Sequence, residues 1–235
     1  MYVAARMPRR FSKFLEIYLL DLQIVDRTHV SVGANVLLGY VLDFYVKYKR
    51  KPETGDYMNI TVYLGANPGK DEKYKKGVWE LGTWIAEAGH RLIYGGSAVG
   101  LMGVLADAVL AGGGEVIGVE PGFFVRDALQ HEGITQLIVT ETMQERKKIM
   151  LEMGDVYIAF PGGTGTLEEI AEAISQTKLG LSDKKSILFN LDGYYDPLIE
   201  MIERMTEEEF LFREERRGLF FARTVEEIAA IISGS

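Results

Sequence analysis

The stretch DVYIAFPGGTGTLEEI, residues 155–170, decides how the fold of this chain is interpreted. Its first part, residues 155–160, is a short apolar run that predicts a strand, and the residues after the last glycine predict a helix. A tight turn between a strand and a helix needs one glycine or two. This junction holds three glycines and two threonines, followed by two adjacent glutamates. The surplus of small residues indicates a ligand at the turn.

The same alternation of short β-branched runs and longer amphipathic runs extends outward from this stretch. The further predicted strands are residues 59–66, 91–96, 115–120, 136–140 and 185–191, the last being the final strand. The predicted helices are residues 71–89, 100–114, 142–154, 165–180, 195–210 and 224–234. Strands separated by helices are typical of an α/β protein with a doubly wound parallel sheet and helices on both faces. Ligands of such sheets bind at the carboxyl ends of the strands, where the glycines after Tyr94 and Phe160 lie.

The first 57 residues differ from the rest. Residues 11–25 and 32–48 show mixed helical periodicity, and the second segment ends in the basic, proline-containing KYKRKPETGDY. We predict a nucleotide-binding catalytic domain over residues 58–235 and an N-terminal helical extension over residues 1–57. The extension could be a helical cap or a dimerisation arm, and a start of the protein at Met58 is equally open.

The composition excludes several functions. The formal charge is −8, from 26 basic and 34 acidic residues, which argues against a nucleic-acid partner. The chain has no cysteine, and its three histidines, His29, His90 and His131, lack metal-binding spacing, so we predict no metal. The longest early apolar run, residues 30–46, contains Asp43 and is short for a membrane span of about 20 residues. We therefore predict a cytoplasmic protein with no membrane partner.

A first glycine-rich turn, YGGSAVGLMG, spans residues 94–103. Its glycines do not fit the dinucleotide pattern G-x-G-x-x-G. Exposed N–H groups at the start of the following helix could bind a phosphate. Close packing of helix against sheet explains the glycines equally well.

The second turn, PGGTGTLEE, lacks the G-K-[ST] ending of a P-loop. We expect Glu168 and Glu169 in the first helical turn, where the helix dipole stabilises a carboxylate by about 0.3–1 kcal/mol. The same place offers anion-binding amides, so a carboxylate there would stand near a bound phosphate ester and suit chemistry at the adjoining sugar. The helix before this strand carries the basic pair Arg146 and Lys147, either a solvated charge run or a phosphate ligand.

Taken together, GGSAVGLMG, MQERK, PGGTGTLEE and FNLDGYYDPLIEMI resemble the LOG ("lonely guy") family, formerly described as lysine decarboxylases. The pattern PGG-x-GT-x-x-E is matched at every fixed position. The resemblance covers residue 59 to the end of the chain. It implies a modified Rossmann fold, usually homodimeric, that hydrolyses the N-glycosidic bond of an adenine-type nucleoside 5′-monophosphate to the free base and ribose 5-phosphate, without a cofactor.

Carried over by motif, the resemblance makes Arg146 and Glu169 the catalytic pair. The expected substrate-binding residues are Gly95, Gly96, Gly100, Met102, Gly103, Lys147, Gly162, Gly163, Thr164, Gly165, Thr166, Leu167, Glu168 and Ser175. The chain departs from the family at Thr164, where an aromatic residue is common, at Ser175–Gln176, where a Thr-Trp pair is common, and at Ala128, where a glutamate is common. These departures concern recognition of the base more than of the phosphoribose.

Two other functions remain open from sequence. A module of the same fold could bind a nucleotide or nucleotide-like cofactor without cleaving it, but such a module has no evident use for Arg146 and Glu169 beside the sugar. A pyridoxal-phosphate decarboxylase would need a Schiff-base lysine, and no lysine is singled out by its context.

Overall fold

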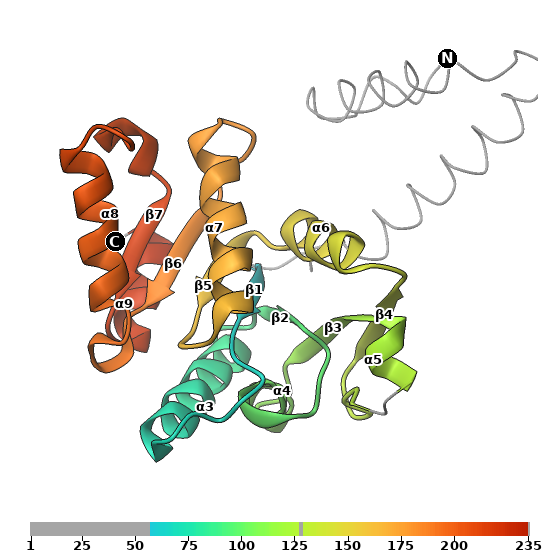
Figure 1. Ribbon diagram of the computed structural model, residues 1–235. Helices are drawn as coiled ribbons and strands as arrows, with labels where there is room; N and C mark the ends of the chain where they lie inside the picture. The colour runs from blue at the N-terminus through green and yellow to red at the C-terminus, as the bar shows by residue number, and fades with distance from the viewer. Residues whose placement is uncertain (1–56, 127–128, 235) are drawn as a thin grey trace, which may run out of the picture. The chain divides into compact units, whose positions relative to one another are not determined.

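The computed structural model describes residues 57–126 and 129–234 of the chain. These residues form a seven-stranded parallel sheet in the order β4-β3-β2-β1-β5-β6-β7 (Figure 1). The predicted α/β fold with a doubly wound parallel sheet is confirmed. Apart from Tyr57, the expected N-terminal extension over residues 1–57 lies outside the described residues.

The strands are β1 (Asn59–Tyr63), β2 (Arg91–Tyr94), β3 (Glu115–Pro121), β4 (Gln136–Thr140), β5 (Val156–Ala159), β6 (Lys185–Phe189) and β7 (Leu219–Ala222). The helices are α3 (Glu72–Glu87), α4 (Gly100–Ala111), α5 (Gly122–Arg126), α6 (Met143–Met153), α7 (Thr164–Lys178), α8 (Asp196–Glu207) and α9 (Val225–Ser233). Two short 3₁₀ helices, η3 (Leu191–Gly193) and η4 (Arg213–Arg216), flank α8.

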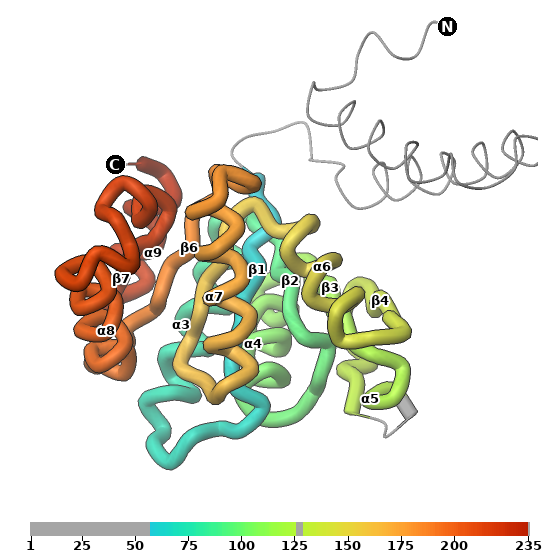
Figure 2. The backbone as a smooth tube through the Cα atoms, turned by 45° about the horizontal axis from the view of Figure 1, so that its top comes forward, coloured from blue at the N-terminus to red at the C-terminus, as the bar shows by residue number. Residues whose placement is uncertain are grey.

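Helices cover the sheet on both faces. Helices α3 and α4 pack against each other on one face together with α9, whereas α6 and α7 contact the central strands from the other (Figures 1 and 2). Because both faces are covered, the central strands are buried along their whole length rather than at alternate residues; all five residues of β1 are buried. The core lies between the sheet and α3, α4 and α9, with Ile60, Leu81 and Leu105 among its fully buried members.

The predicted end of the sheet was wrong. A seventh strand, β7, pairs in parallel with β6 beyond the strand that was expected to be the last. Its four residues, LFFA, follow a highly charged segment and include none of the β-branched residues by which the other strands were recognised. Helix α5 was missed because five residues are too few to show a helical period.

The strand order reverses between β1 and β5. Chain segments leave β1 and β5 in opposite directions at this point, so their carboxyl-terminal loops diverge and leave a crevice, the usual ligand site of open α/β sheets. Within the described residues, no helix combines the length and the apolar character that crossing a membrane requires.

Candidate active site

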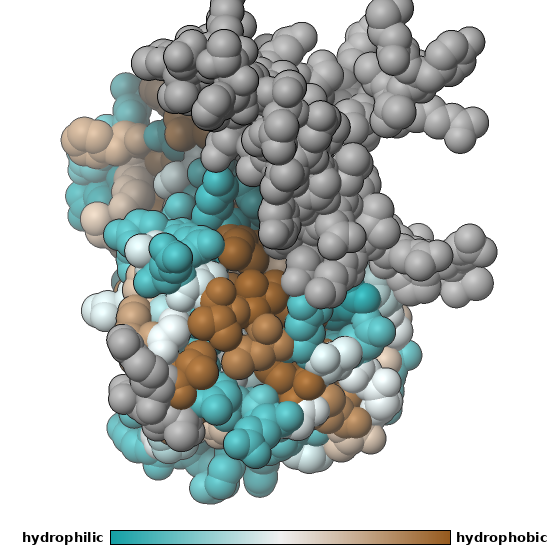
Figure 3. Space-filling view, turned by 90° about the vertical axis from the view of Figure 1, so that its right-hand side faces the viewer, coloured by the Kyte–Doolittle hydropathy of each residue, from teal (hydrophilic) through white to brown (hydrophobic). Residues whose placement is uncertain are grey.

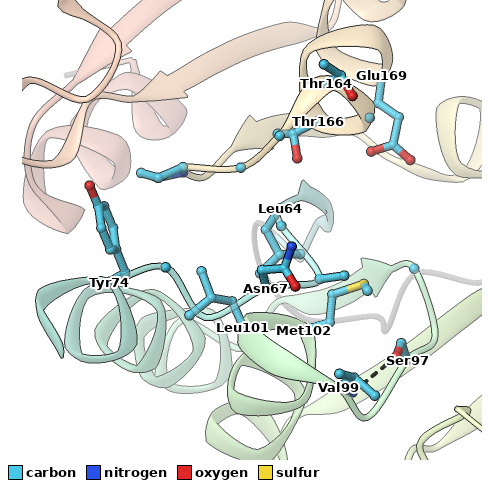
Figure 4. A pocket seen from close by; sticks show the side chains of 18 of the residues that line it. Leu64, Asn67, Tyr74, Ser97, Val99, Leu101, Met102, Thr164, Thr166 and Glu169 are labelled. Carbon is cyan, nitrogen blue, oxygen red and sulfur yellow. Dashed lines mark hydrogen bonds between the residues drawn. The ribbon is translucent and has the colours of Figure 1, made fainter. Parts of the chain in front are cut away.

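A cavity of about 760 Å³ lies at this reversal point. Its size falls within the range of about 300–1,000 Å³ that is usual for small-molecule sites. The loops after β1, β2 and β5 line it, together with the first residues of α4 and α7. In Figure 4, Thr164, Thr166 and Glu169 of α7 lie on one side of the cavity, and Asn67, Leu101 and Met102 lie on the other.

The amino end of α7 is open to this cavity. Gly163 is its N-cap residue and supplies no side-chain hydrogen bond. Helices α3, α6 and α9, in contrast, are capped by the side chains of Asp71, Thr142 and Thr224. The first N–H groups of any helix have no intrahelical acceptor, so those of α7 are available to an anion, which the positive end of the helix dipole also favours.

The three glycines of PGGTGT have two different reasons to be glycine. A Cβ on Gly162 would stand 2.2 Å from Oγ1 of Thr166 and 2.8 Å from the backbone nitrogen of Gly65, so packing requires a glycine there. A Cβ on Gly163 or Gly165 would meet nothing within 4 Å. Both residues line the cavity, and packing within the protein does not require them to lack a side chain. Packing within the described residues therefore accounts for Gly162 and leaves open space beside Gly163 and Gly165.

The expected position of the two glutamates was wrong. Helix α7 begins at Thr164, so Glu168 and Glu169 lie in its second turn and not its first. The extended backbone of Gly163 ends the loop one residue earlier than predicted. Because the effect of the helix dipole falls off within the first turn, helix-start chemistry does not explain this pair of acids.

Glu169 points into the cavity and is paired with Arg146 of α6. Nη1 of Arg146 lies 2.5 Å from Oε1 of Glu169, and both side chains are 11% exposed. Nε of Arg146 donates to the carbonyl of Val119, 3.0 Å away, which fixes the guanidinium between β3 and α7. Burial raises the pKa of Glu169 above its ordinary value, and the guanidinium of Arg146 opposes this rise. The sequence-predicted catalytic pair is thus assembled at one wall of the cavity.

Two tyrosines of the DGYYD segment hold the glycine turn in place. The hydroxyl of Tyr194 donates to the carbonyl of Gly162 at 2.5 Å, and that of Tyr195 donates to the carbonyl of Phe160 at 2.8 Å. The side chain of Asn190 fixes this segment in turn, since its Oδ1 accepts from the backbone nitrogen of Tyr195 at 2.7 Å. The segment therefore supports the glycine turn beside the cavity, and Tyr194 itself lines the cavity.

The first glycine turn serves mainly packing. A Cβ on Gly100 would stand 1.7 Å from the carbonyl oxygen of Ala66, and one on Gly103 would stand 2.1 Å from that of Ala98. The side chain of Ser97 holds the turn through hydrogen bonds from the backbone nitrogen of Val99 and to the carbonyl of Leu129 (Figure 4). Of the two explanations for these glycines, helix–loop packing accounts for Gly100 and Gly103.

The structure brings together part of the predicted substrate-binding set. The cavity is lined by Gly95, Met102, Gly162, Gly163, Thr164, Gly165 and Thr166, together with Arg146 and Glu169. The remaining members do not line it: Gly96, Gly100, Gly103, Lys147, Leu167, Glu168 and Ser175. Ala128 lies outside the described residues.

For two of these residues the structure shows why they do not line the cavity. Lys147 is one residue beyond Arg146 on α6 and points elsewhere, with its ammonium 2.7 Å from Glu168 and 3.3 Å from Glu172. Ser175 is eleven residues along α7 from Thr164, a distance of about 16 Å at 1.5 Å per residue.

Two charged residues that the sequence reasoning missed line the cavity. Lys70 lies in the loop after β1, and Glu120 lies near the carboxyl end of β3. A signal for each was present, because the loop GANPGK follows a strand at the ligand-binding edge, and the acid in VIGVEP interrupts an apolar strand.

Comparisons with known proteins identify the relatives of this chain. A family model described as "possible lysine decarboxylase" matches residues 102–232. A cytokinin riboside 5′-monophosphate phosphoribohydrolase of Rhodococcoides fascians is 42% identical over 177 residues, which cover 74% of this chain and 89% of that protein. The cytokinin riboside 5′-monophosphate phosphoribohydrolase LOG of Oryza sativa subsp. japonica is 38% identical over 172 residues, which cover 73% of this chain and 71% of that protein.

Solved structures share the fold. The molybdenum cofactor binding protein of Rippkaea orientalis has a TM-score of 0.59 at 24% identity, covering 77% of this chain and 98% of that one. The Moco carrier protein of Chlamydomonas reinhardtii has a TM-score of 0.58 at 23% identity, covering 76% and 97%. At this identity the likeness concerns the architecture alone. The sequence relatives, the motifs and the cavity that those motifs line lead to one conclusion: the chain belongs to the LOG family of phosphoribohydrolases, the family whose model is described as a possible lysine decarboxylase.

Proposed function

We propose that this protein hydrolyses the N-glycosidic bond of an adenine-type nucleoside 5′-monophosphate and releases the free base and ribose 5-phosphate. The observation that carries the proposal is the buried Arg146–Glu169 pair, which faces the cavity beside the uncapped amino end of α7. The relatives of R. fascians and rice bear the name of this activity.

The phosphate fits the start of α7. The first N–H groups of the helix, the hydroxyls of Thr164 and Thr166 and the space above Gly163 and Gly165 form a cradle for an anion. Lys70 lines the same cavity and supplies a positive charge. An anion held here lies about one helical turn from Glu169, which places the sugar of the same nucleotide beside the carboxylate.

The reaction is a displacement at the anomeric carbon. A water molecule adds to this carbon, the bond to the base nitrogen breaks with its electron pair going to the base, and the base takes up a proton. Positive charge develops at the anomeric carbon as the base leaves, as in glycoside cleavage. The carboxylate of Glu169 stabilises that charge and orients the water, while Arg146 holds the carboxylate in position and donates a hydrogen bond to the departing group.

The proposal extends to a homodimer. The side of the molecule on which β4 and α5 lie carries a gathering of apolar side chains (Figure 3), and Phe123, Phe124 and Val139 of these two elements are exposed. Phe124 also lines the cavity, so a second copy on this side would lie near the site. Light scattering of the purified protein tests the assembly: twice the chain mass supports it, and the mass of one chain rejects it.

A substrate screen tests the activity. The purified protein is incubated with a panel of purine and pyrimidine nucleoside monophosphates, including AMP and isopentenyl-AMP, and ribose 5-phosphate is measured. Release from an adenine nucleotide, abolished by Glu169→Gln and Arg146→Ala, supports the proposal. Tight binding of AMP that is recovered intact would instead identify a nucleotide-binding module.

A further inference from the structure

Glu120 is a buried acid among the residues that line the cavity. It lies one residue before the end of β3, at the edge of the sheet where the loops of the cavity gather. The residue is 2% exposed, and its buried Oε2 has no hydrogen-bond partner among the residues that the structure describes. Burial raises the pKa of Glu120, and the guanidinium of Arg146 partly opposes this rise. A buried carboxyl group without a partner is costly, so its presence calls for an explanation.

Packing alone does not call for an acid at this position. A Cβ on Gly96 would stand 2.9 Å from Cβ of Glu120, a contact that any residue other than glycine at position 120 would make. A Cβ on the preceding Gly95 would stand 2.7 Å from Nη2 of Arg146, so the glycine pair after β2 packs closely against both positions. The rest of β3 from Val116 to Val119 is apolar or glycine and fully or nearly buried, so packing alone would favour an apolar residue at position 120.

Different residues of the cavity suit the phosphate, the sugar and the base of a nucleotide. The uncapped start of α7 takes the phosphate, and Glu169 with Arg146 marks the anomeric carbon. Arg146 bridges from Glu169 to the carbonyl of Val119, the neighbour of Glu120. Glu120 lines the same cavity, as do the apolar residues Met102, Leu129 and Met143. An apolar wall with one polar group suits a planar base.

We infer that Glu120 contacts the leaving base and accepts a hydrogen bond from its exocyclic amino group, which makes it a specificity-determining residue for 6-aminopurine nucleotides. The inference rests on the proposed function for the orientation of the nucleotide. An unpaired carboxylate oxygen requires a donor, and the 6-amino group of adenine supplies one, as does the remaining N–H of an N6-substituted adenine. A 6-oxopurine presents a carbonyl oxygen at the same place, so two acceptors would face each other and leave Glu120 unpaired.

The test compares AMP with IMP, which differ at the 6-position. The full chain and its Glu120→Gln variant are assayed for kcat/KM on both nucleotides. In a separate assay, added ribose 5-phosphate, which lacks the base, is tested as a competitive inhibitor. We expect the wild-type protein to favour AMP by at least about tenfold, because IMP would leave the buried acceptor unpaired. Glutamine retains an acceptor and gains a donor for the 6-carbonyl, so the AMP:IMP ratio should fall by about tenfold, with inhibition by ribose 5-phosphate unchanged.

Two further variants keep the result interpretable. Glu115→Gln makes the same change at the other end of β3, where Glu115 is exposed and paired with Arg91, and should leave the AMP:IMP ratio unchanged. Glu120→Leu replaces the acid with an apolar residue of similar length that suits the buried strand. It should lose the preference for AMP without gaining activity on IMP.

The outcomes separate this inference from the proposed function. An unchanged AMP:IMP ratio in Glu120→Gln and Glu120→Leu, or no preference for AMP in the wild-type protein, overturns the role of Glu120 and leaves the hydrolase standing. If no nucleotide is cleaved, the hydrolase fails, and calorimetric binding of intact AMP and IMP to the same variants decides the role of Glu120. Equal effects on both nucleotides would show a structural role only and would also overturn it.

Discussion

The chemistry of a single residue, Glu169, carries the hydrolase proposal. Its carboxylate is buried, faces the cavity and forms an ion pair with Arg146. Replacing it with glutamine preserves the shape of the side chain and removes the negative charge that stabilises the developing positive charge on the sugar.

For Glu169→Gln we expect kcat on AMP to fall by about 10²–10⁴-fold, the usual contribution of a positioned catalytic group. Binding of AMP should persist, because the phosphate is held by α7. The variant Glu152→Gln makes the same change at an exposed position of α6, outside the cavity, and serves as the control. A loss of AMP binding that matched the loss of kcat/KM, with kcat unaltered, would show that Glu169 binds substrate without taking part in the chemistry.

Glu120 should also make the stability of the protein depend on pH. Burial raises the pKa of Glu120 and Arg146 of α6 lowers it, and Glu120 in turn helps to raise the pKa of Tyr94 of β2. Because its folded-state pKa lies above the value of about 4.3 for an unfolded glutamate, the folded protein holds the proton more tightly. The stability that this proton provides is present at low pH and is lost as the pH rises through the folded-state pKa.

Glu120→Gln removes this dependence. We expect the melting temperature of the variant minus that of the wild type to increase from pH 5 to pH 8, measured by differential scanning fluorimetry. A difference that stays constant over this range, or that decreases with pH, would contradict the assignment of Glu120 as a buried acid with a raised pKa.

Sequence reasoning found Arg146 and Glu169 but not Glu120, for a physical reason. Motif spacing marks residues on turns and helix starts, where glycines and polar residues cluster. Glu120 lies within an apolar strand outside every motif, so the acid in VIGVEP was its one signal in the sequence, and its place in the cavity lining follows from the three-dimensional structure. Lys147 was expected at the site because it adjoins Arg146, yet the helix turns its side chain toward Glu168 and Glu172.

At the scale of secondary-structure elements, two glycines at the amino end of α7 allow the role in packing to be tested apart from the proposed role in ligand binding. Gly165→Ala adds a methyl group where nothing lies within 4 Å, at a helical position where alanine is favoured over glycine by roughly 0.5–1 kcal/mol. We expect a higher melting temperature and a raised KM for AMP, since the methyl group enters the phosphate cradle.

Gly162→Ala is the matched variant two positions from the helix start. Its Cβ would collide with Thr166 and with the backbone of Gly65, so its melting temperature should fall. If Gly165→Ala stabilised the protein and left KM unaltered, the phosphate would not lie at this end of α7.

Most elements were predictable, and the exceptions have physical reasons. Periodic segments such as α3 and α9 carry both an amphipathic pattern and a capping residue, Asp71 or Thr224. β7 has none of the β-branched residues that mark the other strands, and α5, with five residues, is too short for a helical period to be recognised. The start of α7 was misplaced by one residue because a glycine cap leaves no side-chain signal in the sequence.

At the scale of the whole molecule, topology places the site. The order β4-β3-β2-β1-β5-β6-β7 opens a crevice between the loops after β1 and β5, and the cavity lies there. The alternation of strands and helices was sufficient to predict a parallel sheet and the edge at which a ligand binds. The separation of Ser175 from the cavity, and the close approach of Ala66 to Gly100, depend on distances in three dimensions that no sequence pattern contains.

The most direct test is a crystal structure of the Glu169→Gln variant with intact AMP bound. The account predicts the phosphate on the backbone nitrogens of Thr164–Thr166, the anomeric carbon beside residue 169 and Arg146, and the 6-amino group of the base at Glu120. A phosphate bound elsewhere, or a sugar carbon remote from both residue 169 and Arg146, would contradict it.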